Sequence, residues 1–320
     1  MADVRLRVVI GPTAAGKSAA ALWLAERHGG AILSADSRQI YRGFDIGTAK
    51  PTAAELARVP HYGVDVADPR ERYSAARWAD EARRWMADAV QRGRTPMVVG
   101  GTGFYVRALV APLFDAPPMD EARRAALERL LATLPSHELR RWVRTLDPDR
   151  AHLGRAQLLR AAEVALLTGR RISALHRAPP SRPPLPARYL VIDPGHERLR
   201  QRIEQRVDAM FAAGWGDEVR RLMRQVPPLA PAWNACGYAA VRDALAGGHD
   251  ARAAREAVVV ATRQYAKRQR TWIRHQLAGE AVTVMDPASP DAAARIEAWW
   301  AGEEATQPVD AHDGGVEAGR

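Results

Sequence analysis

The sequence predicts an α/β fold, a doubly wound parallel sheet core with an inserted all-helical domain. Short apolar runs of the length of buried strands recur along the chain and alternate with segments of helical character, a pattern typical of a parallel sheet covered by helices. A long helical stretch without a strand-like run interrupts the alternation in the middle of the chain. We therefore expect one sheet domain whose sequence is split by a helical insertion.

Apolar runs define the predicted strands of the sheet. Each run is short, rich in Val, Ile, Leu or Ala, and followed by a turn or a helical segment, as expected for strands buried on both faces. The predicted strands are residues 6–10, 31–34, 97–99, 189–192 and 282–285.

The insertion falls between the third and fourth predicted strands. Residues 119–177 are rich in Glu, Arg, Leu and Ala, which favour helix, and a connector with five prolines follows at 179–186. The predicted organisation is a first core part at 1–115, an inserted helical domain at 116–186, a second core part with a basic C-terminal helix at 187–300, and a disordered acidic tail at 301–320.

The charge of the chain is unevenly distributed. The 320 residues carry 47 Lys and Arg against 37 Asp and Glu, a formal net charge of +10. Residues 301–320 hold five acidic residues and one Arg, a net charge of −4, so the first 300 residues carry +14. Such a basic body predicts a polyanionic partner.

Several classes of protein are excluded. The chain has a single cysteine, which excludes a small module held together by disulfides. It has no apolar run of 18 residues, and Asp3, Arg5 and Arg7 interrupt the first nine positions, where a signal peptide would need an apolar stretch. We expect a cytoplasmic protein without a membrane partner.

Residues 11–18 form a complete G-x-x-x-x-G-K-[ST] motif between the first predicted strand and a predicted helix at 18–28, the context that this motif requires. Its glycines let the backbone wrap around an anion, and the loop amides and helix N-terminus direct positive partial charge towards it. Lys17 adds a mobile cation, and the Ser18 hydroxyl is a predicted Mg²⁺ ligand. The core is therefore predicted to be P-loop NTPase-like. The predicted phosphate-binding residues are Gly11, Pro12, Thr13, Ala14, Ala15, Gly16, Lys17 and Ser18.

The motif alone does not identify the phosphate compound. The third predicted strand runs into Gly100-Gly101-Thr102-Gly103 without the terminal Asp that serves as a Walker B metal partner. No Asn-Lys-x-Asp run is present to bind a guanine base. These absences favour a diphosphate that is not a nucleoside triphosphate, although the motif by itself also predicts ATP binding.

Asp36 and Thr102 follow the second and third predicted strands. Asp36 therefore lies at the carboxyl edge of the sheet, where ligands of open α/β sheets bind. It could bind a metal, accept a proton from a nucleophile, or cap a following helix. Thr102 reaches the same rim, either towards a ligand or as a turn hydroxyl bonded to its own backbone.

Residues 253–277 are predicted to form one helix without Pro or Gly. Spacings of four, three and four residues place a row of cations on one face, and aromatic residues with Gln269 form a second stripe. Cations beside aromatics are typical of RNA-binding surfaces, although a solvated face over a core stripe has the same pattern. The cations are Arg263, Lys267, Arg270 and Arg274, and the aromatic residues are Tyr265 and Trp272.

Five blocks of the sequence together resemble bacterial tRNA dimethylallyltransferases. They are Gly-Pro-Thr-Ala-Ala-Gly-Lys-Ser at 11–18, Asp-Ser-Arg-Gln-Ile-Tyr at 36–41, Asp-Ile-Gly-Thr-Ala-Lys-Pro at 45–51, Gly-Gly-Thr-Gly-Phe-Tyr at 100–105 and Lys-Arg-Gln-Arg-Thr-Trp-Ile-Arg at 267–274. The resemblance covers roughly residues 4–300 in order and includes all three lysines of the chain. It implies transfer of a dimethylallyl group from dimethylallyl diphosphate to the N6 amine of the adenosine 3′ of the tRNA anticodon, with Mg²⁺ as cofactor and a monomeric enzyme.

The resemblance also implies roles for individual residues. Asp36 and Thr102 match positions at the reacting amine, and Arg220 matches an arginine expected to hold the diphosphate. The implied tRNA-binding residues are Asp36, Ser37, Arg38, Gln39, Thr102, Arg124, Gln157, Leu158, Leu159, Arg160, Ala161, Lys267, Arg268, Gln269, Arg270 and Arg274.

Two other classes of function remain open. A P-loop small-molecule or nucleoside kinase would use Asp36 to activate a hydroxyl, with the helical insertion as a lid. A non-enzymatic, ATP-dependent RNA-binding protein would leave Asp36 and Thr102 without a role. The basic helix and the +14 body argue against a metabolite kinase, which needs neither.

Overall fold

The computed structural model describes residues 5–111, 117, 119–178, 183–277, 280–303 and 307–308. The chain divides into two compact units. The first unit comprises Met1–Val110 and Leu185–Arg320, and the second comprises Ala111–Pro184, compared with the insertion at 116–186 expected from the sequence. The two units are described separately below.

The first unit is built on a single sheet with the strand order β3-β2-β4-β1-β5-β6-β7. All neighbouring strands are parallel except β6 and β7, which are antiparallel. The predicted α/β class and all five predicted strands are confirmed. The strands are β1 Leu6–Ile10, β2 Gly30–Ala35, β3 His61–Tyr62, β4 Thr95–Gly100, β5 Ala187–Ile192, β6 Ala281–Met285 and β7 Gln307–Pro308.

The sequence pattern did not predict β3 and β7. Each has only two residues in the structure, too short to show an alternation of apolar and polar positions. Gln307–Pro308 lies within the predicted acidic tail, while residues 304–306 and 309–320 of that tail fall outside the described residues.

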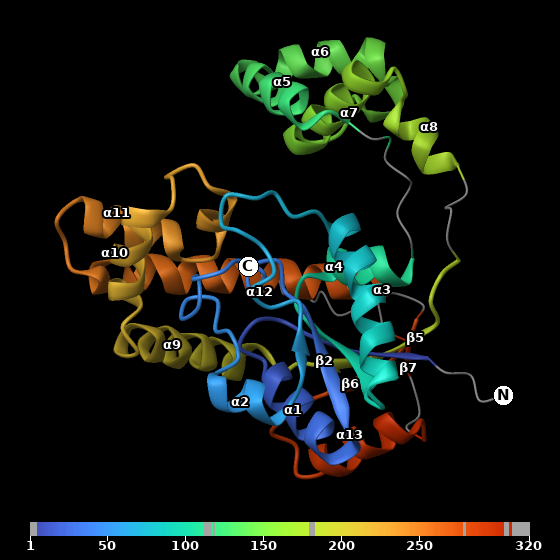
Figure 1. Ribbon diagram of the computed structural model, residues 1–320, viewed down its shortest axis with the longest axis vertical. Helices are drawn as coiled ribbons and strands as arrows, with labels where there is room; N and C mark the ends of the chain where they lie inside the picture. Colours follow the sequence, from blue (N-terminus) through green and yellow to red (C-terminus); the bar gives the residue numbers. More distant parts are fainter. Residues whose placement is uncertain are drawn as a thin grey trace, which may run out of the picture. The chain divides into compact units, whose positions relative to one another are not determined.

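The central strands carry the core of the first unit. Val8 on β1 pairs with Val98 on β4 and with Tyr189 on β5, and all three side chains are buried. Figure 1 shows α1 and α13 on one side of the sheet and α3 and α4 on the other. Because both faces are covered, the strands read as nearly continuous apolar runs.

Helices of the first unit begin and end at residues suited to those positions. Thr52 and Glu55 form a reciprocal capping box at the start of α2, and the Ser74 side chain caps α3. The predicted basic helix at 253–277 is α12, which is preceded by a 3-10 turn at Ala251–Ala254. The helices are α1 Lys17–His28, α2 Ala53–Arg58, α3 Ala75–Gln91, α4 Gly103–Val110, α9 His196–Ala212, α10 Trp215–Gln225, α11 Tyr238–Ala246, α12 Arg255–Gln276 and α13 Ala292–Ala301.

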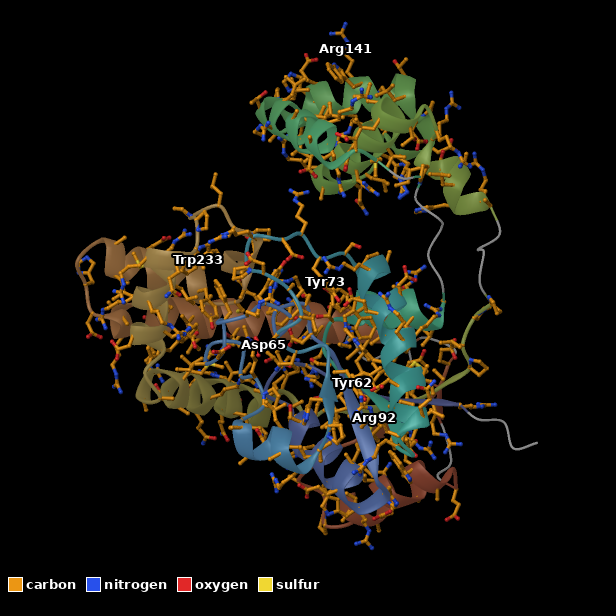
Figure 2. All side chains as sticks on the ribbon, viewed as in Figure 1. Tyr62, Asp65, Tyr73, Arg92, Arg141 and Trp233 are labelled. Atoms are coloured by element: carbon orange, nitrogen blue, oxygen red, sulfur yellow. The ribbon has the colours of Figure 1, made fainter. Side chains whose placement is uncertain are left out.

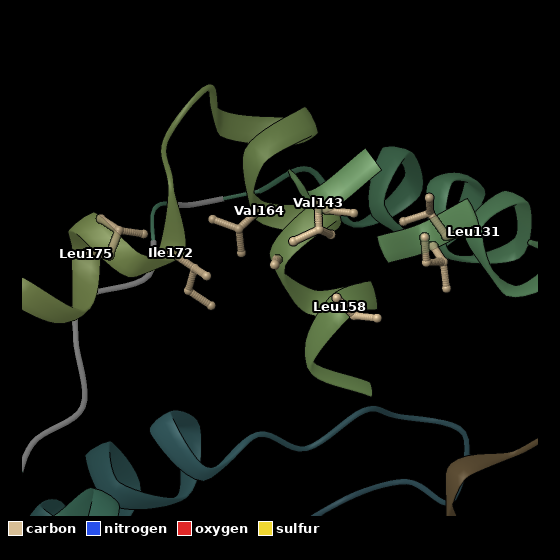
Figure 3. Packing of buried hydrophobic residues seen from close by; sticks show 9 residues of the cluster. Leu131, Val143, Leu158, Val164, Ile172 and Leu175 are labelled. Carbon is tan, nitrogen blue, oxygen red and sulfur yellow. The ribbon is translucent and has the colours of Figure 1, made fainter. Parts of the chain in front are cut away.

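The second unit is all-helical. It contains α5 Glu121–Thr133, α6 Ser136–Leu146, α7 Arg155–Thr168 and α8 Ile172–Arg177, with a 3-10 turn at Pro148–Arg150. Its core is a small apolar cluster between these helices, part of which Figure 3 shows. The buried residues of this cluster are Leu131, Leu139, Val143, Leu158, Ala161, Ala162, Val164, Ile172 and Leu175.

None of the helices in the described parts of the chain is both long and apolar enough to cross a lipid bilayer.

Candidate active site

The order of the strands brings three sequence motifs to one edge of the sheet. Strand β4 lies between β1 and β2, and the register pairs Ile10 with Gly100 and Gly100 with Ala35. The phosphate loop, Asp36 and Thr102 follow these three strand ends directly. The sheet therefore places all three features at the same carboxyl edge, where ligands of such sheets bind.

The phosphate loop has the backbone conformation of an anion-binding turn. Ala14 and Gly16 have positive φ values of 63° and 105°, and α1 begins immediately after Gly16. A Cβ atom at Gly11 would lie 2.2 Å from the carbonyl oxygen of Ile192 on β5, so only glycine fits there. Arg202 of α9 supports the loop from outside by donating to the Ala15 carbonyl at 2.9 Å.

Lys17 is partly buried inside this loop, where its Nζ donates to the Pro12 carbonyl at 2.7 Å. Burial and, to a smaller extent, the positive charge of Arg206 lower the pKa of Lys17 to about 7, while the negative charge of Asp36 opposes both effects. An arriving phosphate would supply the negative charge that a protonated Lys17 lacks, so the site is electrostatically prepared for an anion.

Asp36 has one oxygen engaged by the backbone. Its Oδ1 accepts a hydrogen bond from the Arg38 amide at 2.8 Å, and turns rather than a helix follow it at 37–40. The alternative that Asp36 caps a following helix is therefore wrong, because its side chain stabilises a turn. Among the described residues no partner is found for Oδ2, which leaves this oxygen available to a ligand.

Thr102 ties the Asp36 turn to the end of β4. Its Oγ accepts a hydrogen bond from the Ser37 amide at 3.0 Å, and its own amide donates to the Ala35 carbonyl at 3.1 Å. Tyr265 of α12 lies against this rim, and burial raises its pKa, as does the charge of Asp36, while a hydrogen bond with Thr102 opposes the increase. The Thr102 hydroxyl therefore bonds to the Asp36 turn and not to its own backbone.

Two cavities meet at Asp36. The larger, of ≈370 Å³, extends from Lys17 and Ser18 past Asp36 to Lys50 and His61. The smaller, of ≈50 Å³, is lined largely by apolar side chains, including Val207, Met210, Trp215 and Val258. Thr13, Asp36 and Arg206 line both cavities, so a ligand bound at the phosphate loop would have its far end beside Asp36.

Sequence reasoning missed Arg206. It lies on α9 and faces both cavities, where burial lowers its pKa and the charge of Asp36 opposes this shift. Among the described residues no carboxylate lies within ion-pair distance of Arg206, so its charge faces the cavities. No pattern in the sequence distinguishes it, because Arg198, Arg200 and Arg202 lie in the same helix.

Arg220 does not take the place predicted for it. Its guanidinium pairs with Asp217 at 2.5 Å on the exposed side of α10, and it lines neither cavity. The structure therefore does not bring Arg220 to the phosphate loop, where α9, and not the exposed face of α10, supplies the neighbouring arginine.

The amides of Gln39 and Gln269 are both engaged by protein groups. Gln39 accepts from the Ser34 hydroxyl at 2.8 Å and donates to the carbonyls of Thr48 and Ala49. Gln269 accepts from the Thr13 amide at 2.8 Å, donates to the Gly101 carbonyl at 2.9 Å and is buried. Both were predicted to bind tRNA, but in this structure their amides hold the walls of the site.

The predicted cationic face of α12 separates into two groups. Arg263 pairs with Glu204, and Arg270 forms two hydrogen bonds with Asp193 at 2.6 and 2.8 Å. The other cations of this face are exposed. An open groove of ≈560 Å³ runs along them, lined by Gln264, Lys267, Arg268, Thr271, Trp272, His275 and Gln276.

The predicted tRNA-binding residues of the helical unit have different surroundings. Leu158 and Ala161 have no exposed surface, so the prediction that their side chains bind RNA is wrong. They belong to the core cluster of this unit. Arg124 and Arg160 both pair with the buried carboxylate of Glu163. Gln157 is exposed and caps α7 by accepting from the Gly154 amide at 3.1 Å, and Leu159 is half-buried.

The donor set at the phosphate loop fits a partly hydrated Mg²⁺. The exposed Ser18 side chain and the Asp36 carboxylate line the same cavity. Across the described residues there is no group of three His, Cys, Asp or Glu side chains that could hold a metal alone. Mg²⁺ commonly binds through one or two protein oxygens together with phosphate oxygens and water, so these residues fit such an ion only when a diphosphate is bound.

Comparison with known proteins identifies the family. The family model described as IPP transferase matches residues 39–276 of this chain, which include the Asp-Ile-Gly-Thr-Ala-Lys-Pro segment, Thr102, Arg206 and all of α12. The chain belongs to the IPP transferase family. The resemblance inferred from the five sequence blocks is confirmed.

Similar members of the IPP transferase family carry a common name. A tRNA dimethylallyltransferase of Halorhodospira halophila is 45% identical over 286 residues, which cover 87% of this chain and 92% of the relative. A tRNA dimethylallyltransferase of Deinococcus radiodurans is 40% identical over 300 residues, which cover 92% and 95%.

Solved structures show the same fold as this IPP transferase family member. The tRNA isopentenylpyrophosphate transferase of Bacillus halodurans superposes with a TM-score of 0.65 at 33% identity and covers 93% of this chain and 96% of its own. A eukaryotic dimethylallyltransferase described as acting on tRNA has a TM-score of 0.78 at 24% identity, covering 95% and 81%.

Proposed function

We propose that this chain transfers the dimethylallyl group of dimethylallyl diphosphate to the N6 amine of the adenosine 3′ of the anticodon in tRNA. The observation that carries this proposal is the meeting of an anion site with a carboxylate: Lys17 and Arg206 line the same cavity as Asp36. Membership of the IPP transferase family and the names of the relatives support the choice of donor and acceptor.

The anion site acts on the leaving group. The N6 nitrogen forms a bond to C1 of the dimethylallyl group while the bond from C1 to the diphosphate oxygen breaks, so negative charge grows on diphosphate. The loop amides, protonated Lys17 and Arg206 surround the position where this charge develops, which lowers the barrier to the substitution. Mg²⁺ bound through Ser18 would add further charge stabilisation to the diphosphate.

Asp36 acts on the nucleophile. An exocyclic adenine amine is a weak nucleophile and loses a proton when it is alkylated. A carboxylate oxygen held by the turn to Arg38, with its other oxygen available, can orient the amine and accept that proton. The hydroxyl of Thr102 and the neighbouring Ser37 and Arg38 lie on the same rim, where an extruded adenosine would have to enter.

The exposed cations of α12 fit contacts with the phosphate backbone of the RNA. Lys267, Arg268 and Arg274 are solvent-exposed, and Lys267 and Arg268 line the open groove together with Trp272, on which a base can stack. These contacts make the affinity for RNA depend on salt concentration. We further propose that the protein works as a monomer in the cytoplasm.

The experiment combines the protein, Mg²⁺, labelled dimethylallyl diphosphate and an anticodon stem-loop RNA with adenosine 3′ of the anticodon. We expect label in this RNA and none in a matched RNA with guanosine at that position, which lacks the N6 amine. Parallel reactions with γ-labelled ATP and nucleosides test the kinase alternative. Transfer of phosphate, with no label from dimethylallyl diphosphate in RNA, would replace the prenyl-transfer proposal by the kinase.

A further inference from the structure

The loop at 45–50 contains a buried lysine. The Lys50 side chain is 5% exposed, and its Nζ donates to the Tyr41 carbonyl at 2.7 Å and to carboxylate oxygens of Asp45 at 2.6 Å and Asp65 at 2.5 Å. Asp65 is labelled in Figure 2. All three ammonium hydrogens of Lys50 are therefore used within this segment, and a guanidinium would not match three converging acceptors.

A buried carboxylate holds the other side of the loop. Glu218 of α10 accepts hydrogen bonds through Oε2 from the backbone amides of Asp45 at 3.2 Å and Ile46 at 2.8 Å. The next amide, that of Gly47, donates to the Tyr238 hydroxyl at 3.1 Å, and this hydroxyl donates to Glu218 Oε1 at 2.5 Å. Three consecutive amides thus converge on one side-chain pair that is buried.

Close packing at Gly47 leaves no room for a side chain at this position. A Cβ atom there would lie 2.3 Å from the ring of Trp215, which is fully buried. The rings of Trp215 and Tyr238 pack edge to face with centroids 5.3 Å apart. The loop is therefore clamped by hydrogen bonds and by aromatic packing at the same point.

The clamped loop forms the walls of the candidate active site. Gly47 and Thr48 line the smaller cavity, and Ala49 and Lys50 line the larger one. The carbonyls of Thr48 and Ala49 also hold the amide of Gln39, three residues after Asp36. A displacement of residues 45–47 would therefore move the carbonyls of Thr48 and Ala49. Because these carbonyls hold Gln39, the turn that carries Asp36 would move as well.

We propose that Glu218, acting with Tyr238, is a positioning residue that fixes the 45–50 loop and so aligns the Asp36 turn with the acceptor amine. The proposal rests on the proposed prenyl transfer. Glu218 lines neither cavity, so it acts through the loop and not on a substrate. The phosphate loop and Arg206 lie on other segments, so the clamp holds none of the groups that contact the diphosphate and acts chiefly on the acceptor.

Two substitutions test this proposal with little change of volume. Glu218→Gln keeps the shape of the side chain but leaves either the two loop amides or the Tyr238 hydroxyl without an acceptor, because one carboxylate oxygen is replaced by an amide NH2 group, which only donates. Tyr238→Phe removes only the hydroxyl. The matched control is Asp217→Asn, whose carboxylate is 83% exposed on the same helix.

The measurements are kcat and KM for stem-loop RNA, the dissociation constant of inorganic pyrophosphate, and hydrogen exchange of the 44–50 segment. For Glu218→Gln and Tyr238→Phe we expect kcat/KM for RNA to fall about tenfold, as for the loss of one buried hydrogen bond to a charged group. Pyrophosphate affinity should stay within about twofold, and exchange should accelerate in 44–50 alone. Asp217→Asn should match the wild type in every measurement.

Equal losses of RNA turnover and pyrophosphate affinity, with faster exchange throughout the protein, would reduce Glu218 to a general stability role and overturn the proposal. Unchanged kcat/KM in both variants would overturn it as well. If the wild-type protein fails to transfer the dimethylallyl group, the proposed function fails first. In that case the acceptor role fails with it, while faster exchange confined to 44–50 still establishes the clamp itself.

Discussion

The side-chain carbonyl of Gln269 accepts a hydrogen bond from the backbone amide of Thr13 at 2.8 Å, across 256 positions of sequence. The same side chain donates to the Gly101 carbonyl. The basic helix is thereby bonded at one buried point to the phosphate loop and to the turn before Thr102. One face of α12 therefore holds the phosphate loop in place, and another face carries exposed cations.

Replacement of Gln269 by Ala should loosen the phosphate loop. It leaves the Thr13 amide and the Gly101 carbonyl without their buried partner, at a cost of about 1–3 kcal/mol in the free energy of unfolding. The affinity for pyrophosphate should fall as well, and calorimetry with each variant measures both quantities. Gln264→Ala, an exposed position on the same helix, is the control. Equal effects of the two substitutions would contradict the role of the Gln269 bond.

The lowered pKa of Lys17 predicts a pH-dependent affinity. In the free protein Lys17 loses its proton above about pH 7, whereas a bound diphosphate favours the charged form. Binding therefore takes up a proton above pH 7, and the affinity for pyrophosphate should fall by up to about tenfold per pH unit. Lys17→Arg does not titrate in this range, so its profile reports only the ionisation of the ligand. Identical profiles would contradict the pKa assignment.

The same shift has the opposite effect on the stability of the free protein. Between the folded value of about 7 and the ordinary value of 10.5, the unfolded chain binds more protons at Lys17 than the folded protein does. The contribution of Lys17 to the free energy of unfolding should therefore rise with pH in this window. Denaturant unfolding at several pH values, compared with Lys17→Arg, measures it, and a contribution that falls with pH would refute the prediction.

Asp36→Asn should separate chemistry from donor binding. The amide oxygen can still accept from the Arg38 backbone, so the turn is kept, but the group can no longer take up a proton. We expect prenyl transfer to RNA to slow by about 10²–10⁴-fold while the dissociation constant of pyrophosphate changes little. Single-turnover rates with saturating RNA provide the measurement. Near-normal turnover would remove Asp36 from the mechanism.

The two groups of cations on α12 should respond differently to substitution. Lys267→Gln removes an exposed charge, so it should weaken RNA binding and reduce the slope of log affinity against log salt by about 1, without loss of stability. Arg270→Gln breaks the partly buried pair with Asp193, so it should lower the melting temperature. Filter binding at several salt concentrations and thermal unfolding measure these effects. A salt slope unchanged in Lys267→Gln would contradict the contact with RNA and indicate that this face is only a solvated surface.

Leu158→Ala should unfold the helical unit and leave the sheet unit folded. Leu158 is fully buried in the core cluster, and such a truncation costs about 2–5 kcal/mol. Leu166, 43% exposed on the same helix, provides the control substitution to Ala. Limited proteolysis locates the unfolded region. Resistance of both variants to cleavage within 121–177 would contradict the prediction.

The fold and the centre of the site were predictable because they depend on local patterns. Apolar runs mark the strands, and the positions just after 6–10 and 31–34 identify the phosphate loop and Asp36 without knowledge of packing. Arg206 was not predictable, because one arginine among four in α9 is selected only by how that helix lies against the sheet. The partners of Gln269 were equally hidden, because its place in the aromatic stripe does not show which segments that stripe contacts.

The helical unit enters and leaves the sheet unit at neighbouring points. Chain segments 75 positions apart meet where the Leu185 amide donates to the Val110 carbonyl at 2.9 Å, at the end of α4 and just before β5. A linker of a few glycines would suffice to close this gap and leave the strand order of the sheet unaltered. The helical unit is thus one continuous insertion that can be removed or exchanged without changing the order or connections of the strands in the sheet.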